Sequence, residues 1–331
     1  MHRYGATRAL ILAALAAALF IAVGAVALAG DGPEVFRLAD PRGDDHGDGS
    51  LIYPQRDDIE KGELDILSFS ASADKAGTVF EVVFAKPVRK PDRRTIDELG
   101  NTLDSLARLG FYNFNVDIYI DTDRIPGSGS TVMLPGRRAT IDPAFAWEKA
   151  ICLTPRPALA AGGLRSLLER QRKLELKSRQ GRVTDEDEKQ IATTVAKDVA
   201  ADIFFPTLVW VTGNRVRFFV PASFLGGVAQ DSWGYVVADS VADLQASVDL
   251  GSALGGDPRA PALMIVPVGR GRGAAFLGGG YEDDNLEPPL VDIIVPTGVK
   301  QENVLKDYDL RVDRPVKLPG VVPADLKSLK K

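Results

Sequence analysis

The chain has 331 residues, of which 45% are hydrophobic and 26% charged, a composition that supports a sizeable globular core. The formal net charge is -5, and without Arg3 and Arg8 of the N-terminal segment it is -5 - 2 = -7. We expect no nucleic-acid partner, because phosphate binding requires a basic surface. Cys152 is the only cysteine, and His46 is the only histidine after His2. This excludes an internal disulfide and multi-histidine zinc sites, and it leaves few nucleophile–base pairs.

The N-terminus has the layout of a secretory signal. Arg3 and Arg8 precede an uncharged apolar run over residues 9–29, which ends on Ala27-Leu28-Ala29. This order of basic, apolar and small residues is typical of a signal peptide, and the run is also long enough to span a bilayer. We expect residues 1–29 to be a cleaved signal peptide or an N-terminal membrane anchor. The protein would then be exported to the periplasm, the cell surface or the medium, with membrane contact only through this segment.

Short alternating segments separated by Gly, Pro and Asp follow the leader. In residues 114–121, large apolar side chains alternate with polar ones, which predicts a half-buried strand. Many short strands separated by turns predict a mainly β fold, an antiparallel β-sandwich of jelly-roll or immunoglobulin-like type. The other predicted strands cover residues 65–70, 79–84, 208–211, 216–220, 233–237, 263–268 and 291–295.

Two helical segments interrupt the predicted strands. Residues 95–109 carry apolar side chains at helical spacing after a capping-box pattern that begins at Thr95. A longer segment over about residues 164–201 is basic in its first half, breaks at Gly181 and resumes after Thr184, a helix cap followed by four acids. We interpret it as a charged helical hairpin inserted between strands. It is either a solvated excursion packed on the sandwich or a docking element for a partner or an anionic membrane.

These elements form one unit in our interpretation. We expect a single β-sandwich domain over residues 30–313, with the helical insertion at about residues 164–201. Residues 314–331 are rich in Pro and Lys and are expected to form a flexible tail.

The most distinctive segment is residues 40–49, a loop rich in aspartate and glycine. Asp44, Asp45 and Asp48 are close in sequence, and like charges repel unless a cation lies between them. Oxygen-rich loops with glycine at sharp turns commonly bind Ca²⁺. The spacing differs from that of an EF-hand, because His46 interrupts it and no closing glutamate follows. From spacing alone, the loop is either a calcium site or an acidic surface turn.

Several further motifs follow this loop and together resemble a known family. They are Tyr53-Pro54, Asp65-Ile66-Leu67-Ser68-Phe69, Val116-Asp117-Ile118-Tyr119-Ile120-Asp121, Leu134-Pro135-Gly136-Arg137-Arg138, Trp233-Gly234-Tyr235, Gly278-Gly279-Gly280, Val291-Asp292-Ile293-Ile294-Val295-Pro296 and Gln301. Over roughly residues 38–310 the sequence resembles the C-terminal module of glucodextranases, which is also found in extracellular pullulanase-type enzymes. That family is similar to the β-sandwiches of some carbohydrate-binding modules and DOMON-type domains.

The resemblance implies a calcium-supported β-sandwich that binds sugar or a cell-wall polymer. The Ca²⁺ ligands that we then expect are Asp40, Asp44, Asp45 and Asp48. We expect an exported, non-catalytic binding protein, without catalytic residues, that recognises an α-glucan or another envelope polysaccharide. Two alternatives stay open: a structural or assembly protein of the cell envelope, and a glycoside hydrolase that uses two of the many acids.

Sugar binding by stacking requires exposed aromatic side chains. The candidates near the glycine-rich loops are Trp233, Tyr235 and Tyr281. Most Trp residues of a β-sandwich lie in its core, so each candidate also has a purely structural explanation.

Overall fold

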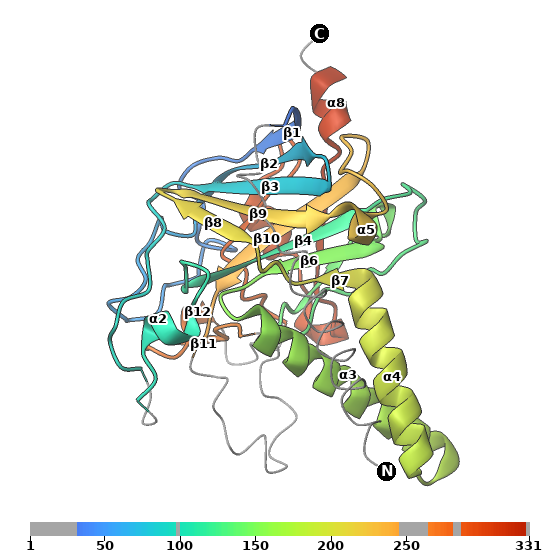
Figure 1. Ribbon diagram of the computed structural model, residues 1–331. Coiled ribbons are helices and arrows are strands. Elements are labelled where there is room, and N and C mark those ends of the chain that lie inside the picture. The colour runs from blue at the N-terminus through green and yellow to red at the C-terminus, as the bar shows by residue number, and fades with distance from the viewer. Residues whose placement is uncertain (1–31, 97–99, 245–263, 281–285, 329–331) are drawn as a thin grey trace, which may run out of the picture.

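Two five-stranded sheets packed face to face form the body of the protein (Figure 1). The computed structural model describes residues 32–96, 100–244, 264–280 and 286–328. The first sheet contains β1 (Glu34–Ala39), β2 (Ile66–Asp74), β3 (Gly77–Phe84), β8 (Val209–Thr212) and β9 (Arg215–Pro221), in the order β1-β2-β3-β9-β8. The second contains β4 (Phe114–Asp121), β6 (Lys149–Leu153), β7 (Ile203–Phe204), β10 (Gly234–Val241) and β13 (Asp292–Ile293), in the order β13-β10-β4-β6-β7. The prediction of a mainly β sandwich is confirmed.

Apolar side chains from both sheets fill the space between them. Phe69 and Phe80 of the first sheet stack with ring centroids 5.4 Å apart, and Ile118 and Val237 reach the same cluster from the second sheet. Each of these four side chains is fully buried. The period-two alternation that predicted the strands therefore also identifies the residues that meet in the core.

β4 is more deeply buried than its sequence suggests. All eight of its residues are buried, whereas the alternation predicted one solvent-exposed face. The outer face is covered by a second apolar cluster, in which Tyr119 packs with Trp147, Leu164 and Val195. Its polar residues are paired there, as Asp117 is with Arg137 through two hydrogen bonds.

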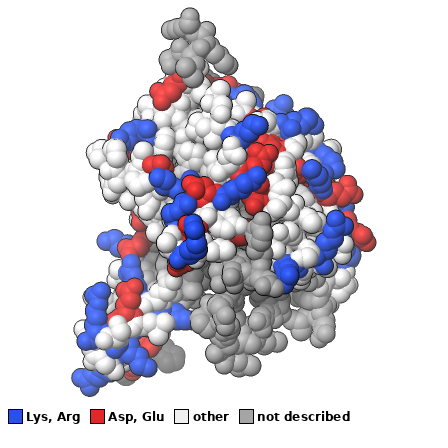
Figure 2. All heavy atoms as spheres, turned by 180° about the vertical axis from the view of Figure 1, so that it is seen from behind, with Lys and Arg blue, Asp and Glu red and all other residues white. Residues whose placement is uncertain are grey.

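The predicted helical hairpin is present between β6 and β7. It consists of α3 (Pro157–Gln180) and α4 (Asp185–Asp202), so its first helix begins before the predicted start. Gly181 ends α3 in the left-handed conformation, with φ 76°, and Thr184 starts α4 with a capping box. The hairpin projects away from the sheets, and charged side chains cover its outer part (Figures 1 and 2).

The helix predicted over residues 95–109 is largely absent from the part of this range that the structure describes, residues 95–96 and 100–109. There, only α2 (Leu103–Leu106) is helical, and its cap is Thr102 rather than Thr95. Gly100 adopts a φ of 80°, which a continuous right-handed helix does not allow, and the chain turns there. Helical spacing of apolar residues was a false signal at this position.

The predicted flexible tail is also wrong for the residues that the structure describes. β14 (Val316–Leu318) pairs with β5 (Ala139–Ile141), and α8 (Pro323–Ser328) packs on β1. Val316 and Leu318 are fully buried while Lys317 between them is exposed, a short period-two pattern that composition alone concealed.

The remaining short elements connect these layers. They are η1 (Pro143–Phe145), α5 (Ala222–Leu225), β11 (Val268–Arg270), β12 (Leu277–Gly280), α7 (Gln301–Leu305) and η3 (Leu310–Val312). None of the helices in the described ranges is long and apolar enough to cross a bilayer. The expected leader at residues 1–29 lies outside those ranges.

Candidate functional site

The loop of residues 40–49 connects the edges of the two sheets. Its Asp40 N–H donates to Leu67 O in β2 (3.0 Å), and its Gly47 N–H donates to Val291 O beside β13 (2.9 Å). Gly47 has a φ of 59°, and a Cβ atom there would lie 2.8 Å from Leu290 O. Glycine at this position therefore lets the loop lie directly against the end of the second sheet.

Aspartates from the second sheet and from the loop gather beneath it. Asp40, Asp44 and Asp292 place carboxylate oxygens within 4.8 Å of one another. Asp239 of β10 lies directly opposite Asp292 of β13 in the antiparallel pairing, and both are fully buried. Like charges directly opposite each other on neighbouring strands are destabilising. The strands thus hold together carboxylates that would repel one another in the absence of a cation.

Many of the oxygens in this cluster have no hydrogen-bond donor. Within the described part of the chain, no donor reaches either oxygen of Asp40 or Asp239, or one oxygen each of Asp44, Asp65 and Asp292. One oxygen of Asp45, beside the cluster, also has no donor among these residues. An unpaired buried carboxylate is strongly disfavoured unless it neutralises or binds a metal. Hard divalent cations such as Ca²⁺ take ligand sets of this kind, made of carboxylate and carbonyl oxygens.

The pKa values of the cluster reflect the same crowding. Burial, reinforced by the negative charge of Asp44, raises the pKa of Asp40 to about 8. Burial raises the pKa of Asp65 to about 6. The pKa values of Asp239 and Asp292 are also raised, first by burial and then by neighbouring carboxylates. A bound cation would have the opposite effect, because it favours the charged form of each ligand.

The four predicted calcium ligands have different environments. Asp40 and Asp44 belong to the cluster. Asp45 is fully buried beside it, but one of its oxygens already accepts hydrogen bonds from Tyr53 Oη and Gly62 N–H. Asp48 points elsewhere: its Oδ1 accepts from the N–H (2.8 Å) and the hydroxyl (2.7 Å) of Ser50 and so fixes a turn.

Three members of the cluster were not predicted as ligands. Asp65, Asp239 and Asp292 come from strands or strand ends far from the loop in sequence. Each is an aspartate beside or within a largely buried strand, and that was the available signal, because an acid at such a position needs a partner. Sequence spacing within the loop could not identify them.

Gln301, the first residue of α7, fastens the loop to β13. Its side-chain amide donates to Asp44 O, Gly47 O and Val291 O, while its Oε1 accepts from Ile293 N–H (2.7 Å). The side chain is 2% exposed. It thereby fixes both the loop and the strand that carries Asp292.

An open groove lies on the outer side of the same loop. It has a volume of about 600 Å³ and is lined by Asp48, Gly49 and Ser50 of the loop region and by Lys306, Tyr308 and Leu310 after α7. The lining combines a carboxylate, a hydroxyl and an ammonium group with one aromatic ring. Its walls therefore depend on the two segments that Gln301 holds together.

Two of the predicted stacking residues, Trp233 and Tyr235, do not line this groove. Trp233 is 7% exposed and Tyr235 is 1% exposed. The Tyr235 ring packs on Phe36, and its hydroxyl donates to Gln230 O (2.7 Å). Both residues are core residues without a free ring face, which corrects the expectation that they bind sugar. Tyr281 lies outside the described residues.

A second group of acidic residues differs from the first because its carboxylates have hydrogen-bond donors. Asp121, Asp123 and Glu148 also place oxygens within 4.8 Å of one another. Their carboxylates accept hydrogen bonds from nearby groups, including Arg124 with Asp121 and Ser128 with Asp123. This group is a hydrogen-bonded turn and gives a natural control for the bare carboxylates of the first cluster.

A β-sandwich whose loops line an open groove is an architecture that many binding modules share. The particular family follows from comparison with known sequences. Residues 35–320 match the family described as the SLH-like C-terminal binding module of glucodextranase, and the chain belongs to that family. No curated protein matches the chain. The resemblance noted in the sequence is thereby confirmed.

Proposed function

We propose that this protein is an exported, non-catalytic module that binds an α-glucan or another polysaccharide of the cell envelope, with Ca²⁺ beneath the 40–49 loop. One observation carries the proposal: in a chain of a binding-module family, one loop forms both the wall of an open groove and the cover of a buried set of bare carboxylates. The expected leader supports export.

The groove has the chemistry that a polysaccharide requires. Sugars present hydroxyl groups that both donate and accept hydrogen bonds, and a ring face that packs on aromatic side chains. Asp48, Ser50 and Lys306 supply polar groups of both kinds, and Tyr308 supplies a ring. The volume of about 600 Å³ is within the usual range of ligand sites.

The ion would be held by Asp40, Asp44 and Asp292, with Asp65 and Asp239 adding negative charge from the neighbouring strands. It would supply structural support: neutralisation of the cluster and a link between the loop and β13. We propose no catalytic role for it.

Polysaccharide binding is tested by retention of the purified protein on insoluble α-glucan and on isolated cell-wall polymer. Tyr308→Ala should reduce retention at least tenfold, because it removes the ring of the groove. Trp210→Ala, on the edge strand β8 of the first sheet, is the matched control and should bind like the wild type. Full retention by the Tyr308 variant would place the site elsewhere.

Calcium binding is tested by melting curves with Ca²⁺ and with chelator. Stabilisation should be about 2.7 kcal/mol when Ca²⁺ is at a hundred times its dissociation constant. Asp292→Asn should abolish this response, whereas Asp123→Asn in the hydrogen-bonded acidic group should keep it. An identical melting temperature with and without Ca²⁺ in the wild type would remove the ion from the proposal.

The two alternative functions, an envelope assembly protein and a glycoside hydrolase, predict different experimental results. If no polysaccharide retains the protein but an envelope protein co-purifies with it, the assembly function replaces the binding proposal. Release of reducing sugar that is lost on substitution of a single Asp or Glu would establish a hydrolase.

A further inference from the structure

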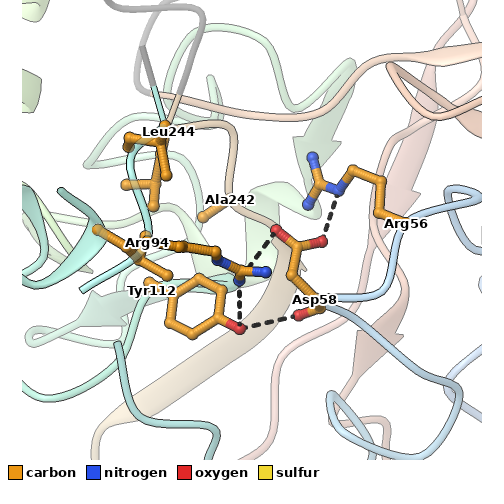
Figure 3. Close-up of a pocket in the computed structure, with 8 residues that line it drawn as sticks. Arg56, Asp58, Arg94, Tyr112, Ala242 and Leu244 are labelled. Atoms are coloured by element: carbon orange, nitrogen blue, oxygen red, sulfur yellow. Dashed lines mark hydrogen bonds and ion pairs between the residues drawn. The ribbon is translucent and has the colours of Figure 1, made fainter. Parts of the chain in front are cut away.

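A separate small pocket lies where three connecting segments meet (Figure 3). Arg56 and Asp58 come from the connection between β1 and β2, and Arg94 and Tyr112 come from the connection between β3 and β4; the third segment follows β10. The pocket is lined by these four residues and by Ile96, Leu103, Ala242 and Leu244.

The polar part of the pocket is built around two guanidinium groups. Arg56 Nε donates to Asp58 Oδ1 (2.8 Å), and Arg94 Nη2 lies 3.8 Å from Asp58 Oδ2. Arg94 also donates to Tyr112 Oη (3.2 Å) with its guanidinium carbon 5.7 Å from the ring centroid. Tyr112 Oη in turn donates to Asp58 O (3.2 Å), so the aromatic ring holds Arg94 in place.

The arginines are incompletely neutralised by the pocket itself. Two guanidinium charges face the single carboxylate of Asp58, which leaves one positive charge in the lining. Asp92, 3.5 Å from Arg94 Nε, has a side chain that is 62% exposed and therefore screened by solvent. Within the described ranges, neither terminal nitrogen of Arg56 has an acceptor.

The other side of the pocket is apolar. Leu103, Ala242 and Leu244 are buried, whereas the side chains of Arg56 and Arg94 are 24% and 41% exposed. The guanidinium groups therefore lie at the mouth and the aliphatic residues at the base. The free space is about 50 Å³, which admits a substituent of a few atoms rather than a whole sugar ring.

We infer that this pocket binds a carboxylate carried by a sugar, so that the polymer recognised by the protein is an acidic envelope polysaccharide rather than a neutral α-glucan. Guanidinium groups bind carboxylates through paired, charge-assisted hydrogen bonds, and two of them at one mouth select a carboxylate over a hydroxyl group. The inference deepens the proposed polysaccharide-binding function by naming the class of sugar. A protein of negative net charge needs such a local site to bind an acidic polymer.

The test is affinity electrophoresis in gels that contain polygalacturonate or, in parallel, neutral dextran, at 150 mM NaCl. The wild type should be retarded by polygalacturonate, and free galacturonate, but not galactose, should relieve the retardation. Arg56→Met combined with Arg94→Met should weaken retardation by polygalacturonate at least tenfold. Arg93→Met combined with Arg108→Met changes the net charge equally outside the pocket lining, and should change retardation less than twofold.

The outcomes separate this inference from the groove proposal. The inference is wrong if the double variant Arg56→Met with Arg94→Met is retarded like the wild type or like the charge-matched control. It is also wrong if polygalacturonate retards the wild type no more than dextran does. Loss of neutral binding in Tyr308→Ala with acidic retardation unchanged would support two separate subsites. If the double variant does not fold, Arg94→Lys keeps the charge but loses the planar fork, and retardation should fall by an intermediate amount.

Discussion

At the scale of single residues, Gln301 and Arg137 show how buried polar side chains hold this sandwich. Each residue is at most 2% exposed, and each joins segments that are distant in sequence. Their hydrogen bonds leave little freedom for substitution, because a buried polar group that loses its partner keeps its desolvation penalty.

Gln301→Leu should lower the free energy of unfolding by about 2–3 kcal/mol. The substitution leaves the Asp44, Gly47 and Val291 carbonyl groups and the Ile293 N–H without the amide. Urea denaturation measures the loss, and Asn303→Ala, exposed on the same helix, is the control and should change stability by less than about 0.5 kcal/mol. Equal stability of the two variants would show that the amide does not fasten the loop.

Arg137→Met should cost about 3–5 kcal/mol, because Asp117 would stay buried without its partner. Both side chains are within 1% of complete burial, and Arg137 also donates to Pro135 O (3.0 Å). The double variant Arg137→Met with Asp117→Leu should recover part of the loss in the same denaturation experiment. A double variant less stable than the single one would contradict the view that the unpaired charge is the main cost.

At the scale of elements, the hairpin of α3 and α4 has two parts. The base belongs to the cluster that covers β4, through Ala160, Leu164, Val195 and Val199. The outer part is held by exposed ion pairs such as Arg172 with Asp198 (2.7 Å) and Lys173 with Glu188 (3.0 Å), which stabilise little. The base of the hairpin packs on the sandwich, as the sequence analysis expects for a surface insertion. Only the outer part is solvated.

Replacing residues 173–188 by a short Gly/Ser linker, which keeps Ile191 on the cluster, should therefore change the free energy of unfolding by no more than about 1 kcal/mol. Leu164→Ala in the base should cost about 2–5 kcal/mol, while Leu174→Ala, whose side chain is 60% exposed, should cost less than about 0.5 kcal/mol. Thermal and urea unfolding measure all three. Loss of cooperative unfolding in the truncated protein would mean that the outer part also supports the sandwich.

At the scale of the whole molecule, the carboxylate cluster should make the pH dependence of stability differ with and without bound metal. Without metal, the raised pKa of Asp40 means that the folded state binds a proton that the unfolded state releases above the ordinary pKa of 3.8. The resulting stability is present at low pH and is lost as the pH rises from about 4 to about 8, the folded-state pKa of Asp40. With Ca²⁺ bound, the ligands stay charged and the trend should reverse.

The measurement is the melting temperature between pH 4.5 and 8 in chelator and in Ca²⁺. In chelator it should fall with rising pH over the part of this range in which Asp40 and Asp65 titrate, and in Ca²⁺ it should rise or stay level. Asp40→Asn combined with Asp292→Asn should flatten both curves. Parallel curves with and without Ca²⁺ would show that no ion binds the cluster.

The sequence by itself determined the hairpin, the family and the strands β2, β3, β4, β8, β9, β10 and β13, because period-two alternation, helix caps and ordered motifs are local features that do not depend on tertiary contacts. It did not predict β1 or β6. It also pointed to the 40–49 loop and to two of the clustered acids, Asp40 and Asp44. Only the tertiary structure decided that Asp239 and Asp292 face each other beneath that loop and that Asp48 belongs to the groove, because strand pairing, not spacing, brings them there. The same holds for Trp233 and Tyr235: whether an aromatic ring meets solvent depends on what the fold packs against it, and here the core covers both.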